Sequence, residues 1–229
     1  MDKELLLNNF AIRAFRDTAD RDYIHARMAY KGKLIQQFLW SGLQAIEKYL
    51  KCIHLLNRQD TRSFNHNLIK SLSTLEINVP FPIRLHARSR KLIEHLNKYG
   101  KDRYLINSYY IEGFELQELD MAVWQLRRYC MLFEGTKELD KLSLQKLIVK
   151  KIAESESQPP QKYKIESGVI EDILADRNNP SRRSLVWNNL FFGVRARKVI
   201  KFTPFMQATN SPLFMHPEML DVLKSYVKT

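Results

Sequence analysis

Residues 33–68 read KLIQQFLWSGLQAIEKYLKCIHLLNRQDTRSFNHNL, and they decide the fold. Their apolar residues recur at steps of three and four, the spacing that places side chains on one face of an α-helix. Two neighbouring sets follow this spacing: Ile35, Leu39, Leu43, Ile46, Leu50 and Ile53, and then Phe38, Gly42, Ala45, Tyr49, Cys52 and Leu56. Because only a narrow polar stripe is left, we predict one long, largely buried helix over residues 33–57.

The rest of the N-terminal part also favours helices. The 229 residues include only seven glycines, well below the usual share of about 7%, and 45% of the chain is apolar. The fold class that we predict is all-α, an antiparallel helical bundle over residues 1–153. The expected helices cover residues 3–16, 17–31, 33–57, 66–75, 83–99, 113–133 and 137–153. Asp17 or Asp20 is expected to cap the second of them.

A change of composition follows the bundle. Residues 154–164 contain Ser, Gln and the pair Pro159-Pro160, which is typical of a linker. Beyond it, residues 165–229 are expected to form a mostly helical, basic extension that packs on the bundle. The elements expected there are helices at 168–175, 181–192 and 217–226 and a strand at 199–203.

The two cysteines and the apolar runs bear on the cellular compartment. Cys52 and Cys130 lie in apolar helical segments, which is typical of buried thiols in a reducing compartment. Neither cysteine belongs to a Cys/His spacing that predicts zinc, so we expect no metal and no cofactor. Because no apolar run approaches about 18 residues, we expect no membrane segment and a cytoplasmic protein.

Positive charge is concentrated in two segments. The chain has a net charge of +12, and residues 84–103 and 177–201 carry net charges of +5 and +7. The net charges of the two segments add up to the net charge of the whole chain, so the remaining residues are balanced. Concentrated cations attract the phosphates of nucleic acids, and they also attract acidic proteins. Charge alone leaves both partner classes open.

Each segment has its own candidate binding residues. In the first, a helix over residues 83–99 would place Arg84, Arg88, Lys91, His95 and Lys98 on one continuous stripe. In the second, the candidates are Arg177, Arg182, Arg183, Arg195 and Arg197. Trp187, Phe191 and Phe192 lie among these arginines and could stack on bases, but their pattern is more typical of core residues.

The run Gln44-Ala45-Ile46-Glu47-Lys48-Tyr49-Leu50-Lys51, followed by His66-Asn67-Leu68, resembles the HEPN family. The resemblance covers roughly residues 17–134, and Asn67 stands where the family usually has Asp. It implies a small helical bundle, usually a homodimer, that binds nucleotides or RNA. The family also includes metal-independent ribonucleases of toxin and defence systems.

Ribonucleases of that family carry an Arg, then His four to six residues later, usually followed by x-Tyr. Arg90 and His95 have this spacing, but Asn97 stands where Tyr is expected, and on a helix the two side chains diverge by about 140°. Arg103 and Tyr110 also fit, but Ser108 replaces His there. The resemblance therefore implies Arg90, His95, Arg103 and Tyr110 as candidate catalytic residues.

These observations predict a HEPN-like protein that binds RNA or nucleotide phosphate and that could cleave RNA without a metal. The alternative is a non-catalytic helical module that binds an acidic protein partner, which the Ser108 substitution favours.

Overall fold

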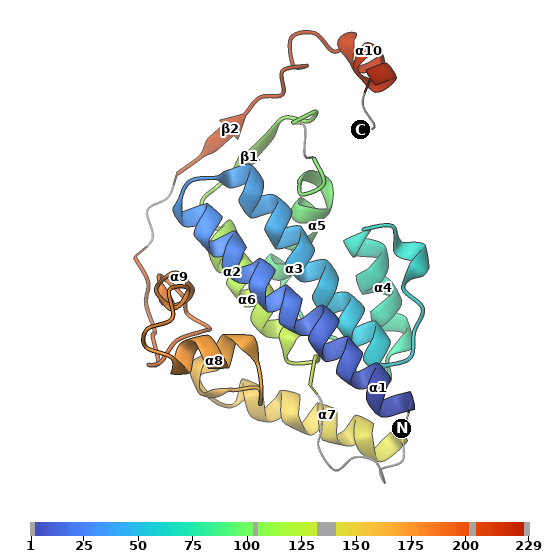
Figure 1. Cartoon of the computed structure of the whole chain (residues 1–229), viewed down its shortest axis with the longest axis vertical. Helices are drawn as coiled ribbons and strands as arrows, with labels where there is room; N and C mark the ends of the chain where they lie inside the picture. Colours follow the sequence, from blue (N-terminus) through green and yellow to red (C-terminus); the bar gives the residue numbers. More distant parts are fainter. Residues whose placement is uncertain (1–2, 103–104, 132–140, 202–204, 227–229) are drawn as a thin grey trace.

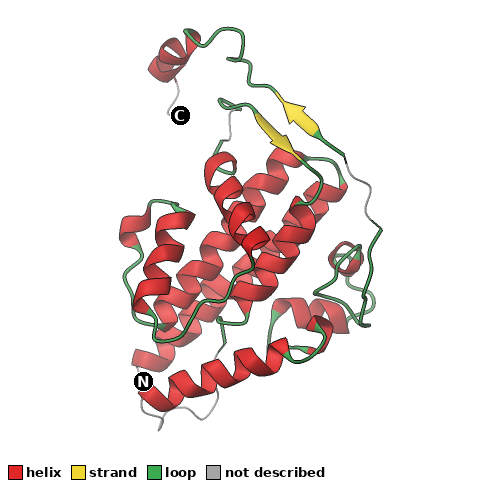
Figure 2. Cartoon of the chain, turned by 180° about the vertical axis from the view of Figure 1, so that it is seen from behind, coloured by secondary structure: helices red, strands yellow, loops and turns green. Residues whose placement is uncertain are grey.

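The computed structural model describes residues 3–102, 105–131, 141–201 and 205–226. Helices dominate this part of the chain, so the predicted all-α class is confirmed. Figures 1 and 2 show a helical bundle built around α3 (Ile35–Leu56), with α7, α8 and α9 beside it. The C-terminal arm, residues 205–226, lies at one end of the bundle. None of the described helices is both long enough and apolar enough to span a membrane.

The chain begins with one continuous helical run. It consists of α1 (Lys3–Phe10), a π-helical turn η1 (Ala11–Arg16) and α2 (Asp17–Lys31). The prediction that Asp17 or Asp20 caps a separate helix is wrong, because Arg16 already has helical φ and ψ angles of −59° and −52°. Asp20 is instead fully buried in the core.

The central helix confirms the prediction made from residues 33–68. It is α3 (Ile35–Leu56), and both of its apolar faces are covered by neighbouring helices. α2 and α3 pack side by side along much of their length, as Figure 1 shows. Both helices contribute buried residues to the hydrophobic core, among them Tyr23 and Phe38.

The next helices differ from the prediction at their ends. α4 (Leu68–Asn78) begins after Asn67, whose side chain accepts a hydrogen bond from the Lys70 amide. α5 (Ala87–Tyr99) begins four residues later than predicted, because His86 is its N-cap. Arg84 therefore lies outside the helical stripe on which it was placed. α6 (Glu115–Arg127) ends six residues before its predicted end.

Two short strands tie the C-terminal arm to the bundle. β1 (Tyr109–Ile111) pairs with β2 (Gln207–Thr209) in antiparallel register, with Tyr110 opposite Ala208. The strand predicted at 199–203 is wrong for residues 199–201, which form no strand, and residues 202–204 lie outside the described residues. The observed strand, β2, lies further along the chain, at the residues that pair with β1.

The extension, residues 165–229, is less helical than predicted, because its helices are short and most of its described residues lie outside them. Its helices are α8 (Val169–Ala175), α9 (Arg182–Val186) and α10 (Met219–Tyr226). Before them, α7 (Lys141–Glu156) covers the helix predicted at 137–153, of which residues 137–140 lie outside the described residues, and η4 (Pro160–Lys162) lies in the predicted linker. The predicted linker at 154–164 is helical in its first three residues, and Ser155 is fully buried. α9 ends before the predicted 192, because the Asn189 side chain accepts the amides of Phe191 and Phe192 in a turn.

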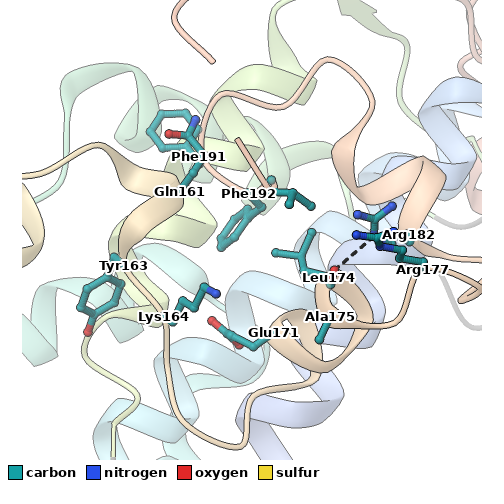
Figure 3. Close-up of a pocket in the computed structure, with 12 residues that line it drawn as sticks. Gln161, Tyr163, Lys164, Glu171, Leu174, Ala175, Arg177, Arg182, Phe191 and Phe192 are labelled. Atoms are coloured by element: carbon teal, nitrogen blue, oxygen red, sulfur yellow. Dashed lines mark hydrogen bonds between the residues drawn. The ribbon is translucent and has the colours of Figure 1, made fainter. Parts of the chain in front are cut away.

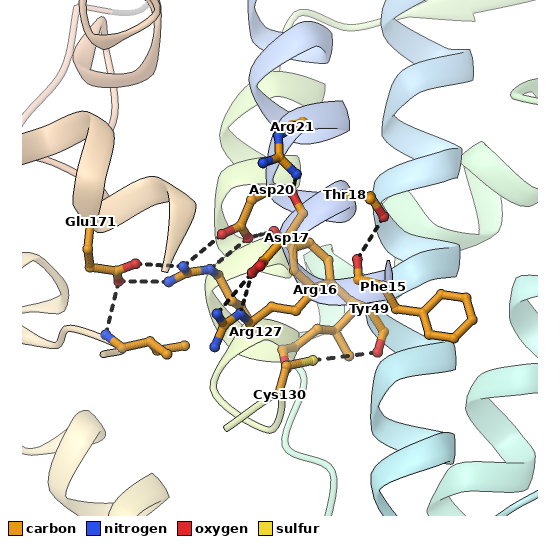
Figure 4. A network of polar contacts seen from close by, with 12 residues as sticks. Phe15, Arg16, Asp17, Thr18, Asp20, Arg21, Tyr49, Arg127, Cys130 and Glu171 are labelled. Carbon is orange, nitrogen blue, oxygen red and sulfur yellow. Dashed lines mark hydrogen bonds and ion pairs between the residues drawn. The ribbon is translucent and has the colours of Figure 1, made fainter. Parts of the chain in front are cut away.

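A buried ion network joins the bundle to the extension (Figure 4). The Arg127 guanidinium on α6 bonds both oxygens of Asp20 on α2, each at 2.8 Å. The same guanidinium bonds both oxygens of Glu171 on α8, at 2.8 and 2.6 Å. Arg127 is 3% exposed and Asp20 is fully buried, so water screens these charges little. One cation thus connects α2, α6 and α8.

A second buried contact joins α2 to the chain around α9. The Arg27 guanidinium pairs with Asp120 and also donates to the main-chain carbonyls of Ser184 and Trp187. Nearby, the Asn189 side chain donates to the Tyr23 hydroxyl at 2.9 Å. The extension is therefore held on the bundle by polar contacts as well as by apolar packing.

Arg127→Met is expected to destabilise the protein strongly. The change leaves the Asp20 and Glu171 carboxylates buried without their cation, which costs roughly 3–5 kcal/mol of unfolding free energy. Urea denaturation measures this loss. Lys151→Met is the control, because the Lys151–Glu154 pair is exposed and its loss changes stability by at most about 1 kcal/mol. Equal losses in the two variants would contradict a structural role for Arg127.

Stability is also expected to depend on the Glu171 carboxylate as pH changes. Burial raises the pKa of Glu171, but Arg127 and the Ile165 amide outweigh burial and hold this pKa below its ordinary value. A carboxylate whose pKa is lower in the folded state than in the unfolded state stabilises the fold at any pH above its unfolded-state pKa, about 4.3. This stabilisation is lost as the pH falls through the folded-state pKa.

Glu171→Gln tests this pH dependence. We expect the unfolding free energies of wild type and Glu171→Gln to differ fully at pH 7 and to converge as pH falls below about 4. Urea denaturation at pH 7, 5 and 3 measures the difference. Glu166→Gln is the matched control, since Glu166 is exposed. A difference that stays constant over this range would exclude Glu171 as the titrating group.

Candidate nucleic-acid interface

The first basic segment forms a helical face that carboxylates partly neutralise. Arg88, Lys91, His95 and Lys98 share one side of α5, as predicted, and the three cations among them are exposed. Lys91 Nζ lies 3.5 Å from Glu112. Glu118, from α6, also interacts electrostatically with Lys91 and Arg88. This face is therefore less positive than its sequence suggests.

Two further cations of this segment are paired with acids from other elements. Arg84 bonds Glu156 of α7 at 2.9 Å, and Arg90 bonds Glu76 of α4 at 2.5 Å. The sequence could not show these pairs, because the partners lie far away in the chain.

The second basic segment keeps its charge. Arg177, Arg183, Arg195 and Arg197 are exposed, and none of them forms a salt bridge with any described carboxylate. We call these four residues the extension surface. Lys198 follows them and is also exposed. In the first segment, by contrast, Arg84, Arg90 and Lys91 each have a carboxylate partner.

Two of the four candidate catalytic residues lie together. The rings of His95 on α5 and Tyr110 on β1 are 6.4 Å apart between centroids and line a small cleft. Arg90 is not in this cleft, because it points to α4, where it pairs with Glu76. Arg103 lies outside the described residues.

The cleft itself is more acidic than basic. Lys91 is its only lysine or arginine among the described lining residues, whereas Glu112, Glu115 and Glu118 all line it. Burial lowers the pKa of His95, so its imidazole is mostly neutral at pH 7. A neutral histidine beside three carboxylates attracts an RNA phosphate poorly.

Ser108, which stands at the position of the family's histidine, has a structural contact. Its hydroxyl accepts a hydrogen bond from the Ser211 amide at 2.9 Å, just beyond β2. This bond continues the attachment of the C-terminal arm that β1 and β2 begin.

A larger cavity lies in the extension, between η4, α8 and the chain after α9 (Figure 3). Its lining includes Arg177 and Arg182, two of the predicted binding residues. It also includes Gln161 and Lys164, which sequence reasoning assigned to a linker. Segments that contain Pro, Gln and Lys are common in linkers, so no local sequence pattern indicates that Gln161 and Lys164 line a cavity.

The comparisons with known proteins add no family. No family model matches this sequence, no curated protein is similar to it, and no solved structure matches its fold. The HEPN resemblance therefore stays an expectation that rests on the residues quoted above.

The ring of His95 gives a direct test of the small cleft. Burial, and to a lesser degree Lys91, lower the pKa of His95, whereas Glu112 raises it. We expect an NMR titration to give a value below the ordinary one of about 6.5. Glu112→Gln should lower this pKa further, and Lys91→Met should raise it. Shifts in the same direction in both variants would contradict the described cleft.

Proposed function

We propose that this protein binds RNA or nucleotide phosphates through the extension surface. The observation that carries the proposal is that Arg177, Arg183, Arg195 and Arg197 are exposed and have no carboxylate partner among the described residues. Exposed cations without a carboxylate partner neutralise phosphates and so release counterions from the nucleic acid. A paired cation must first lose its contact with the carboxylate. The HEPN resemblance supports the same ligand class.

The α5 face has a secondary role in this proposal. Arg88 and Lys98 are exposed and form no salt bridge in the described part of the chain, so they can add phosphate contacts. Arg84, Arg90 and Lys91 contribute less, because each already has a carboxylate partner. A strand of RNA that reaches both surfaces would gain most of its binding energy at the extension.

Cleavage of RNA is not part of the proposal. His95 and Tyr110 lie together, but Arg90 points elsewhere and the cleft holds three carboxylates. Catalysis of phosphoryl transfer needs a cation aimed at the developing negative charge. Lys91 is the one described cation in this cleft, and Glu112 is its partner.

Salt-dependent binding of a labelled single-stranded RNA tests the proposal. In the double variant Arg195→Ala, Arg197→Ala, two phosphate contacts are lost. The slope of log affinity against log salt concentration should therefore become less negative by about 1.4. Arg90→Ala is the control and should change the slope by well under half as much, because Arg90 is paired with Glu76.

Two outcomes would overturn the proposal. One is RNA binding that does not change between about 50 and 200 mM salt, which excludes counterion release as its source. The other is selective retention of polyglutamate with no retention of RNA, which would favour an acidic protein partner and not a nucleic acid.

A further inference from the structure

The cavity in the extension adjoins the extension surface, and Arg177 belongs to both. It has a volume of about 280 Å³. Figure 3 shows Arg177 and Arg182 at one edge of the cavity and Gln161 at the other, with Phe192 and Leu174 between these edges. The cavity therefore has a cationic edge, an apolar centre and a polar amide on the far side.

The two arginines are available to an anion. Arg182 Nε donates to the Leu174 carbonyl at 3.1 Å, which fixes the guanidinium at the edge of the cavity. Its terminal N–H groups have no acceptor among the described residues, and Arg177 likewise forms no hydrogen bond there. Two forked guanidinium groups in this position suit the oxygens of a phosphate.

A carboxylate in the cavity wall does not cancel this attraction. Glu171 lines the cavity, but its two oxygens already accept from Arg127, and one of them also accepts from the Ile165 amide. Lys164 lines the same wall. Because Arg127 is shared with Asp20, these three side chains keep one net negative charge, which the three cations of the lining, Lys164, Arg177 and Arg182, outnumber.

The remaining wall suits a base. Phe192 and Leu174 offer apolar surface, on which a flat ring can pack. Gln161 donates its amide N–H to the Leu190 carbonyl, and its own side-chain oxygen receives no hydrogen bond from the described residues. That oxygen is an acceptor for an exocyclic amino group, such as the one on adenine.

We propose that this cavity binds a single nucleoside monophosphate whose base carries an exocyclic amino group. Its phosphate would contact Arg177 and Arg182, and its base would lie against Phe192 with the amino group at Gln161. The volume is near the lower end of the usual range for ligand pockets, about 300–1,000 Å³, so it suits one nucleotide and no longer chain. This inference rests on the proposed function, in which the same unit is the end of a bound RNA.

Calorimetric titration of the full chain with AMP tests the inference. We expect AMP to bind more tightly than adenosine or inorganic phosphate, because each of these lacks half of the contacts. AMP should also bind several-fold more tightly than IMP, which has a carbonyl in place of the amino group.

Three arginine variants separate the cavity from the surface. Arg177→Ala and Arg182→Ala should each weaken AMP binding roughly 10–100-fold, since each removes a charged hydrogen-bonding group. Arg13→Ala is the matched control, because Arg13 is exposed and belongs neither to the cavity lining nor to the extension surface. It should leave AMP binding unchanged. Arg177 makes no described hydrogen bond, so its variant is expected to fold even if Arg182→Ala does not.

The outcomes for the cavity and for the surface are distinguishable. AMP binding no tighter than phosphate, or an Arg177→Ala variant that binds AMP like wild type, would overturn the cavity proposal whatever RNA does. AMP binding that needs Arg177, in a protein that retains no RNA, would support the cavity and overturn the proposed RNA binding alone.

Discussion

The position of the extension depends on Arg127. This one guanidinium bonds two carboxylates from different parts of the chain, the fully buried Asp20 in the N-terminal helical run and the partly buried Glu171 in α8. Buried charges are tolerated only when they are paired and fully hydrogen-bonded, so the three side chains must keep this arrangement together. α8 forms one wall of the cavity, and the geometry of the cavity is therefore set from inside the core.

Helices with a strong apolar pattern could be predicted from the sequence. The sequence predicts α3 almost to its ends, because its two apolar faces repeat over many turns and the bundle buries both. Helix starts such as those of α4 and α5 were less predictable, since the side chains of Asn67 and His86 act as caps. The short strands were missed at their true place, because a three-residue pairing has almost no sequence pattern and depends on the neighbouring strand.

The positive charge of the candidate site can be predicted from the sequence, but its ion pairs cannot. Net charge along the sequence pointed to both basic segments. It could not show that Glu76, Glu112 and Glu156 lie beside the first of them, since these acids come from α4, from the residue after β1, and from α7. The same limit explains why Gln161 was assigned to a linker. Pairing and cavity formation are properties of tertiary contacts and have no local sequence signal.

Two of the buried arginines, Arg127 and Arg27, differ in the groups that they bind. Arg127 bonds two side-chain carboxylates, those of Asp20 and Glu171, and so depends on these two residues. Arg27 pairs with one carboxylate, that of Asp120, and also donates to the peptide carbonyls of residues 184 and 187, which every amino acid possesses. Substitutions at Ser184 and Trp187 therefore leave these two bonds chemically intact. The outward-facing side chains of this turn can therefore change during evolution, and with them the chemistry of the surface, while the main-chain bonds to Arg27 on α2 are kept.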